Sequence, residues 1–182
     1  RCIWFGVRLN RSGRSLGSRL LRGLIVLAIL VGLVLRILAQ PLSTYIGDDS
    51  DDYGAFARGL LLLFAGDAWR DTPAASGGYG YSPGYPLVTS LFSYVTGNIW
   101  VSARVISLVA GLAVIYATYV LGRELFGSRV GLIAGWIAAV SSVLVGQSAR
   151  TATEMMFVLL VLVALITLLR YQRNHVIGAL KS

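Results

Sequence analysis

Four aspartates gather in residues 48–52, in the order Asp-Asp-Ser-Asp-Asp, and Tyr53 follows them directly. A carboxylate held where water meets lipid can accept the proton of a hydroxyl or amine nucleophile. Much later in the chain, Arg150 and Glu154 form a second polar group, and an arginine can neutralise a phosphate that leaves during a transfer reaction. If folding brings the two segments together, these residue types suit transfer from a phosphorylated lipid.

The aspartates also have a simpler explanation as the start of a helix. Asp49 or Ser50 can cap a helix, and Asp51 and Asp52 then lie in its first turn, where carboxylates oppose the positive helix terminus. One cap needs one carboxylate, whereas four are present. Both explanations stay open on these residues alone.

The composition of the chain is that of an integral membrane protein. Hydrophobic residues make up 56% of it and charged residues 13%, with a mean hydropathy of +0.73. The net charge of +8 comes from basic residues that flank apolar runs, so membrane topology explains it better than nucleic-acid binding does. A single cysteine and a single histidine exclude an internal disulfide, a Cys-based zinc site and a histidine cluster.

Four apolar runs are long enough to cross a membrane, at residues 20–39, 98–121, 130–146 and 155–170. A helix of ~20 residues is roughly 30 Å long and spans the hydrocarbon core. A signal peptide is the alternative for the first run, but the run is long for that role and Gln40-Pro41-Leu42 is a poor cleavage site. The sequence therefore predicts an all-α integral membrane protein with four transmembrane helices in one domain.

Several residues in these spans have expected structural roles. Asn98 caps the second span, and Gly131, Gly135 and Ala139 give the third a ridge of small residues for close helix contact. Arg36 lies near the outer end of the first span, where it can snorkel to the lipid headgroups. Binding of an anionic headgroup by Arg36 is the sharper alternative.

Residues 41–97 form a long polar excursion that holds all four prolines. Apolar side chains at helical spacing in residues 52–64 predict an amphipathic helix that lies in the membrane interface. Residues 87–95 are apolar but too short to span, so they predict a second interfacial or re-entrant helix with Pro86 in its first turn.

The basic residues give the orientation of this arrangement. With a cytoplasmic N-terminus, both termini lie inside and the acidic loop lies outside with Arg150 and Glu154, as the positive-inside rule expects. The inside segments then carry most of the basic residues: Arg1, Arg8, Arg11, Arg14, Arg19, Arg22, Arg123, Arg129, Arg170, Arg173 and Lys181.

The order of these motifs resembles the front part of the GT-C superfamily of glycosyltransferases, in particular its protein O-mannosyltransferase and lipid A aminoarabinose transferase branch. The resemblance rests on a basic N-terminus and one span, then the aspartates of residues 48–52 with Tyr53, then Pro-Gly-Tyr-Pro-Leu at residues 83–87, then Ser-Ala-Arg at 148–150 with Glu154. Nearly the whole chain is covered. The chain itself would be the N-terminal part of a larger enzyme and inactive alone.

The resemblance implies roles for individual residues. Asp49, four residues before Tyr53, matches the catalytic base, and Asp48 competes with it because the register of the aspartates is ambiguous. Glu154 matches the second acidic residue, which positions the base or the acceptor or helps to hold a metal. Arg150 matches a donor phosphate contact, and Arg58 and Arg104 are further candidates for it. Arg58 fits a solvated helix face better, and Arg104 fits an anchor at a helix end equally well. The residues that shape the external loop would be Tyr53, Pro83, Gly84 and Pro86.

The activity implied is an inverting transfer of a sugar from a polyprenyl-phosphate donor to an acceptor lipid, glycan or protein outside the membrane. The membrane would be a bacterial or archaeal plasma membrane. Some members of the superfamily use a divalent cation, which this branch generally does not need, so the resemblance implies no particular metal. The alternatives are a transporter component, which should have ionisable residues near mid-bilayer or paired broken helices, and a non-catalytic scaffold with an acidic external loop.

Overall fold

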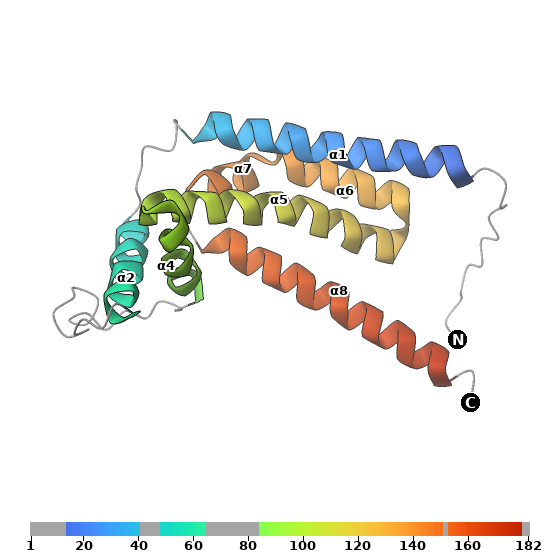
Figure 1. Ribbon diagram of the computed structural model, residues 1–182. Helices are drawn as coiled ribbons and strands as arrows, with labels where there is room; N and C mark the ends of the chain where they lie inside the picture. The colour runs from blue at the N-terminus through green and yellow to red at the C-terminus, as the bar shows by residue number, and fades with distance from the viewer. Residues whose placement is uncertain (1–13, 41–47, 65–83, 151–152, 180–182) are drawn as a thin grey trace.

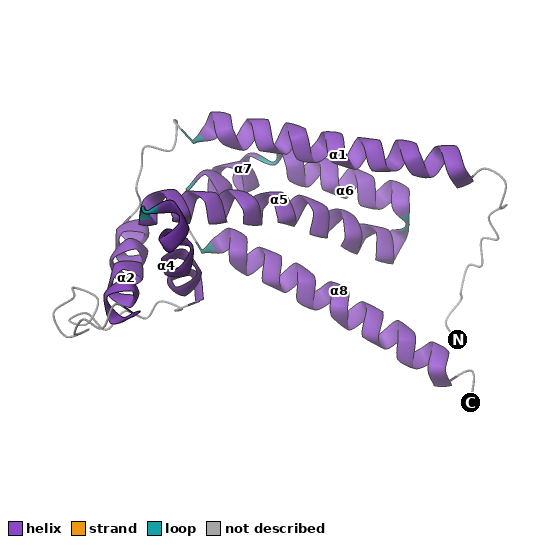
Figure 2. Ribbon diagram, in the orientation of Figure 1, coloured by secondary structure: helices purple, strands orange, loops and turns teal. Residues whose placement is uncertain are grey.

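The computed structural model describes residues 14–40, 48–64, 84–150 and 153–179. Within these ranges the chain is almost entirely helical and has no strand (Figure 2). The helices are α1 (Arg14–Ala39), α2 (Asp48–Phe64), α4 (Gly84–Thr96), α5 (Ile99–Phe126), α6 (Ser128–Val140), α7 (Ser142–Ala149) and α8 (Glu154–Ala179).

Helix α5 is the centre of the bundle, because it packs against every other described helix. Helix α1 lies along α6 and α7, and α8 runs along another side of α5 (Figure 1). Helices α2 and α4 pack against each other at one end of the bundle, which we call the α2–α4 end. The last turn of α1 and the first turns of α5 and α8 also lie at this end (Figure 1).

The buried core lies between α1, α5 and α6, with one contribution from α8. Small residues let these helices approach closely. A Cβ atom on Gly131 would lie 2.6 Å from the Tyr119 carbonyl oxygen of α5, and one on Gly135 would lie 3.0 Å from Ile25 Cδ1 of α1. Ala139 is also fully buried. The predicted ridge of small residues on this helix is therefore confirmed.

The second span is longer than expected. Helix α5 begins where Asn98 caps it, with Asn98 Oδ1 accepting hydrogen bonds from the backbone of Trp100 and Val101 at 2.9 and 3.3 Å. It continues to Phe126, so only Gly127 separates it from α6, whereas the predicted spans leave residues 122–129 between them. Gly127 has φ +95°, a backbone conformation that side chains disfavour, and it therefore permits so short a connection.

The third predicted span is a broken helix, which corrects the expectation of one continuous helix over residues 130–146. Helix α6 ends at Val140, α7 starts at Ser142, and their axes differ by 54°. Ser141 adopts an extended backbone conformation at this break. Serine hydroxyls compete for backbone hydrogen bonds, and the Ser141–Ser142 pair is consistent with a break here.

The fold class predicted from the sequence is confirmed. Three helical segments in the described ranges are long and apolar enough to cross a membrane, at Arg19–Ala39, Ile99–Phe126 and Glu154–His175, and the bent α6–α7 pair can serve as a fourth. Their packing differs: 50% of the most apolar window of α5 is buried within the bundle, against 11% of that of α8. Most of the apolar surface of α8 is therefore open to lipid or to another helix.

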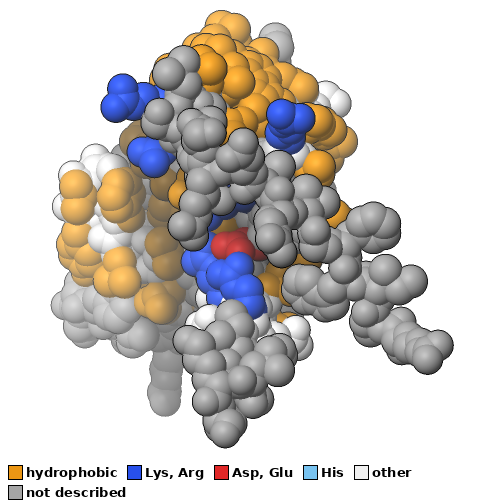
Figure 3. All heavy atoms as spheres, turned by 90° about the vertical axis from the view of Figure 1, so that its right-hand side faces the viewer, with side chains coloured by type: hydrophobic (Ala, Val, Ile, Leu, Met, Phe, Trp, Pro, Cys, Tyr) orange, Lys and Arg blue, Asp and Glu red, His pale blue; other side chains and the backbone are white. Residues whose placement is uncertain are grey.

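The end of the bundle opposite α2 and α4 is strongly basic. Looking onto it, Figure 3 shows one acidic side chain surrounded by basic ones. We call this the basic end. The described arginines that belong to it come from the start of α1, the α5–α6 junction and the last part of α8: Arg19, Arg22, Arg123, Arg129, Arg170 and Arg173.

Candidate active site

Two segments that are far apart in the sequence meet at the α2–α4 end. The Tyr53 hydroxyl, from the second turn of α2, lies 3.3 Å from Thr153 Oγ1, across 100 residues of chain. Thr153 directly precedes Glu154, the first residue of α8, and its carbonyl oxygen accepts a hydrogen bond from the backbone of Phe157. The contact therefore joins the acidic start of α2 to the start of α8.

Tyr85 holds α4 in place beneath this contact. It is 2% exposed, and its hydroxyl donates to the Ala103 carbonyl oxygen at 3.1 Å and lies 3.1 Å from Ser107 Oγ, both on α5. Its ring meets Tyr53 edge to face, with centroids 5.7 Å apart. The aromatic pair links α2 through α4 to the central helix.

The environment of Tyr85 keeps its phenol neutral. Burial raises the pKa of Tyr85 to about 12, and the nearby Glu154 carboxylate adds to the increase because it opposes a second negative charge. The neutral form is the one that can donate a hydrogen bond to the Ala103 carbonyl. Tyr85 is therefore a structural hydrogen-bond donor.

A tight contact seats α2 on the first turn of α5. A Cβ atom on Gly54 would lie 2.7 Å from Cη2 of Trp100, so only glycine fits there. Arg58, one turn further along α2, places its guanidinium 5.9 Å from the centre of the Trp100 ring. Beside it is an open cavity of about 390 Å³, lined by Arg58, Leu61, Ser93, Tyr94, Asn98 and Trp100, among others.

Asp48 and Asp49 lie in the first turn of α2 rather than in a loop before it, which corrects the expected start of this helix. All four aspartates thus fall at the positive end of the helix, where several carboxylates are favourable at once and extend the helix toward the N-terminus. The side chains of residues 48–51 lie outside the described part of the structure.

Most of the other residues expected in the site also lie at the α2–α4 end. Arg150 follows the last residue of α7, Glu154 begins α8, and both side chains are exposed. Arg104 is exposed on the second turn of α5 and makes no hydrogen bond within the described ranges. Gly84 begins α4 and Pro86 is buried in its first turn, as expected, whereas Pro83 lies outside the described residues.

Arg36 does not snorkel to the membrane surface, and this prediction is wrong. Its side chain is 0% exposed within the bundle. Nε donates to Ser148 Oγ at 3.1 Å, and Nη1 donates to the carbonyl oxygens of Gly32 and Ala139 at 3.0 and 3.3 Å. These buried acceptors compensate the guanidinium for its lost contact with headgroups or water.

Three residues make hydrogen bonds here that the sequence did not predict: Tyr85, Thr153 and Ser148. Two of them lie inside motifs that the sequence singled out, Tyr85 between Gly84 and Pro86 and Ser148 just before Arg150. For Tyr85 and Ser148, which lie in short helices, the available signal was a hydroxyl among apolar neighbours, because a buried hydroxyl needs a hydrogen-bond partner.

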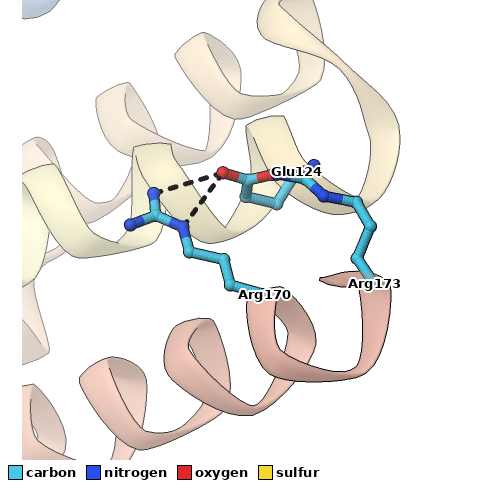
Figure 4. Close-up of polar contacts among 3 residues, drawn as sticks. All are labelled: Glu124, Arg170 and Arg173. Atoms are coloured by element: carbon cyan, nitrogen blue, oxygen red, sulfur yellow. Dashed lines mark hydrogen bonds and ion pairs between the residues drawn. The ribbon is translucent and has the colours of Figure 1, made fainter. Parts of the chain in front are cut away.

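The acidic residue of the basic end has a structural role. Glu124 of α5 forms ion pairs with Arg170 at 3.2 Å and Arg173 at 2.9 Å, both on α8 (Figure 4). The pairs tie the far end of α8 to α5. They lie at the opposite end of α8 from Glu154, so they take no part in the candidate site (Figure 1).

Among the residues whose side chains are described, no group of three His, Cys, Asp or Glu residues could hold a metal ion. The described carboxylates near the site are those of Asp52 and Glu154. The side chains of Asp48 and Asp49 lie outside that comparison.

The helical bundle with its polar end defines the class of this chain as an all-α membrane protein. Residues 80–180 match the family described as dolichyl-phosphate-mannose-protein mannosyltransferase, and because this match covers more than half of the chain, the protein belongs to that family of membrane glycosyltransferases. No curated protein and no solved structure matches the chain. The matched region includes Arg104, Arg150 and Glu154, whereas Asp48 and Asp49 precede it.

Proposed function

We propose that the full-length protein transfers a sugar from a polyprenyl-phosphate donor to an acceptor on the external side of a membrane, with inversion at the anomeric carbon. The contact between Tyr53 and Thr153 carries the proposal, because it joins the acidic turn of α2 to the segment with Arg150 and Glu154. The family adds support for the donor class, since dolichyl-phosphate-mannose is a sugar on a polyprenyl phosphate.

In the proposed reaction, Asp49 removes the proton of the acceptor as the acceptor atom attacks the anomeric carbon. The bond between that carbon and the phosphate oxygen breaks, and its electron pair stays on the leaving polyprenyl phosphate. Arg150 and Arg104 neutralise this developing charge. Glu154 orients the base or the acceptor. Where a divalent cation takes part, Glu154 and the aspartates of α2 would hold it, and it would help to neutralise the charge of the leaving phosphate.

Asp48 remains the alternative base. Consecutive residues on a helix differ by about 100° around its axis. Because Asp48 and Asp49 both belong to the first turn of α2, only one of them should face a given substrate. Single substitutions therefore decide between the two.

The orientation proposed places the basic end in the cytoplasm and the α2–α4 end outside, in a bacterial or archaeal plasma membrane. A cysteine introduced at Gly78 should then react with an impermeant thiol reagent added to intact cells, after Cys2 has been replaced by serine. A cysteine at Ser128 should react only after the cells are opened. The reverse pattern would invert the orientation.

The proposal is tested with the full-length protein by measuring sugar transfer in Asp49→Asn, Asp48→Asn and Glu154→Gln variants. General-base catalysis typically contributes 10²–10⁴-fold, so we expect a loss of about that size from Asp49→Asn. Asp67→Asn removes another carboxylate of the same excursion and serves as the matched control, with unchanged transfer. Undiminished transfer by Asp49→Asn contradicts the assignment, and loss only in Asp48→Asn moves the base by one residue.

One observation favours the alternative of a transporter, namely the broken α6–α7 helix with a buried arginine beside it. Transporters place broken helices around a site that their substrate can reach. Arg36 is fully enclosed, so an ion could contact it only after the helices separated. The family of the chain favours transfer chemistry instead.

A further inference from the structure

The buried side chain of Arg36 bridges the two sides of the α6–α7 break. Ala139, whose carbonyl oxygen accepts from Nη1, lies in the last turn of α6. Carbonyl groups in the last turn of a helix lack intrahelical partners, so Arg36 supplies one across 103 residues of chain. Ser148, which accepts from Nε, lies in the last turn of α7. One guanidinium therefore holds both helices of the bent pair.

The slot around Arg36 is shaped for a flat guanidinium. A Cβ atom on Gly32 would lie 3.0 Å from Nη1, and one on Gly111 of α5 would lie 3.0 Å from Nε. The Cβ on Gly111 would also collide with the Ser148 hydroxyl. Glycines on two helices thus leave just enough room for the side chain and its serine partner.

Arg36 lies in a membrane span, where a charged side chain costs free energy that a packing role alone does not explain. Charged side chains in spans are rare, usually face the interior of the bundle, and by default indicate a functional role. In the described part of the chain no carboxylate pairs with Arg36, and its Nη2 atom has no hydrogen-bond partner. The planar guanidinium donates hydrogen bonds from both Nε and Nη1, and a lysine could not reproduce this arrangement.

We propose that Arg36 is a positioning residue that sets the bend between α6 and α7 and thereby places Arg150 and Glu154 for transfer, an inference that rests on the proposed function. Ser148 lies two residues before Arg150, which directly follows the last residue of α7. Helix α8 then starts at Glu154. A change in the direction of α7 therefore moves both residues relative to α2 and α4.

The test uses the full-length protein and first measures the bend itself. Spin labels at Ile133 and Val143, both exposed on α6 and α7, report the distance across the break. We expect Arg36→Met to shift or broaden this distance, and Arg36→Lys to restore it in part because it keeps the charge. The control Arg22→Met removes an exposed arginine from the same helix and should leave the distance unchanged. An unchanged distance in Arg36→Met overturns the proposal.

The second measurement separates positioning from general stability. A misplacement of about 1 Å can cost on the order of 10²-fold in rate. We therefore expect Arg36→Met to raise the donor KM and lower kcat, at a temperature where its helical circular dichroism matches that of Arg22→Met. Equal kcat and KM in Arg36→Met and Arg22→Met overturn the positioning role.

Gly111→Ala provides an independent variant if Arg36→Met does not fold. It retains Arg36 but displaces Ser148, so it should change the label distance and the donor KM in the same direction. A Gly111→Ala protein with wild-type distance and kinetics contradicts the inference. The label distance needs no activity, so failure of the proposed sugar transfer would leave the bend measurement decisive for the role of Arg36 in the fold.

Discussion

The Tyr53 hydroxyl lies 3.3 Å from Thr153 Oγ1 and joins two helices that begin with acidic residues. Helix α2 contributes the aspartates of residues 48–52, and α8 begins with Glu154. Tyr85 packs against Tyr53 from α4 and is itself bonded to α5. The acidic segments thus share one rigid support, on which the proposed chemistry depends.

We expect Tyr53→Phe to lower kcat/KM several-fold. A neutral hydrogen bond contributes about 1 kcal/mol, and its loss should loosen α2 against α8. A double-mutant cycle with Thr153→Val measures the coupling, which should approach this value because the two residues are in contact. Tyr94→Phe removes an exposed hydroxyl of α4 and is the control. Fully additive effects of Tyr53→Phe and Thr153→Val would show that the contact does not couple the helices.

Gly54→Ala should lower both the thermal stability and the transfer rate. The new Cβ atom would lie 2.7 Å from Trp100, and overpacking of this kind typically costs about 1–3 kcal/mol. Gly23→Ala is the matched control, since nothing lies within 4 Å of its Cβ position on α1. Thermal unfolding of the two detergent-solubilised variants compares them directly. Equal melting temperatures would contradict the close seat of α2 on α5.

The phenol of Tyr85 should titrate near pH 12, well above an ordinary tyrosine. In an absorbance titration at alkaline pH, the ionisation step near pH 12 should be present in the wild type and absent from Tyr85→Phe. Because the pKa is about 10 in the unfolded chain and about 12 in the folded one, the contribution to stability is complete below pH 10. It then falls by about 1.4 kcal/mol per pH unit until pH 12. A titration of Tyr85 near pH 10 would contradict its burial.

Glu124→Gln should affect stability slightly and transfer not at all. The arginines that it pairs with are 48% and 60% exposed in their side chains, and exposed ion pairs contribute about 0–1 kcal/mol. Comparison of melting temperatures at low and high salt measures this contribution, which salt should weaken in the wild type. A large fall in kcat would instead couple the basic end to the site.

Features governed by local rules could be predicted from the sequence. Asn98 was expected as a helix cap because its side chain needs only the two backbone groups that follow it. Apolar length and spacing also predicted the helices at the first, second and fourth spans and the two helices α2 and α4 between the first and second spans. The sequence predicts too late a start for α2, because Asp49 or Ser50 is expected to cap the helix, whereas the helix includes all four aspartates at its positive end.

Features that depend on distant partners could not be predicted. The partners of Arg36 on other helices lie 103 and 112 residues away, so its position in the first span indicated only its depth in the membrane. The break between α6 and α7 was hidden by a continuous apolar pattern without proline. The contact between Tyr53 and Thr153 spans 100 residues, and only the shared membrane face of the two segments pointed toward it.

The donor preference and the stereochemistry of the full-length protein distinguish the proposed transferase from other glycosyltransferases. Membranes with the protein are supplied with sugars on a polyprenyl phosphate or on a nucleotide, and the anomeric configuration of the product is determined. We expect transfer from the polyprenyl phosphate alone, with the configuration inverted, and loss of this transfer in Asp49→Asn. Transfer directly from the nucleotide sugar, or a product that retains the configuration of the donor, would contradict the proposed function.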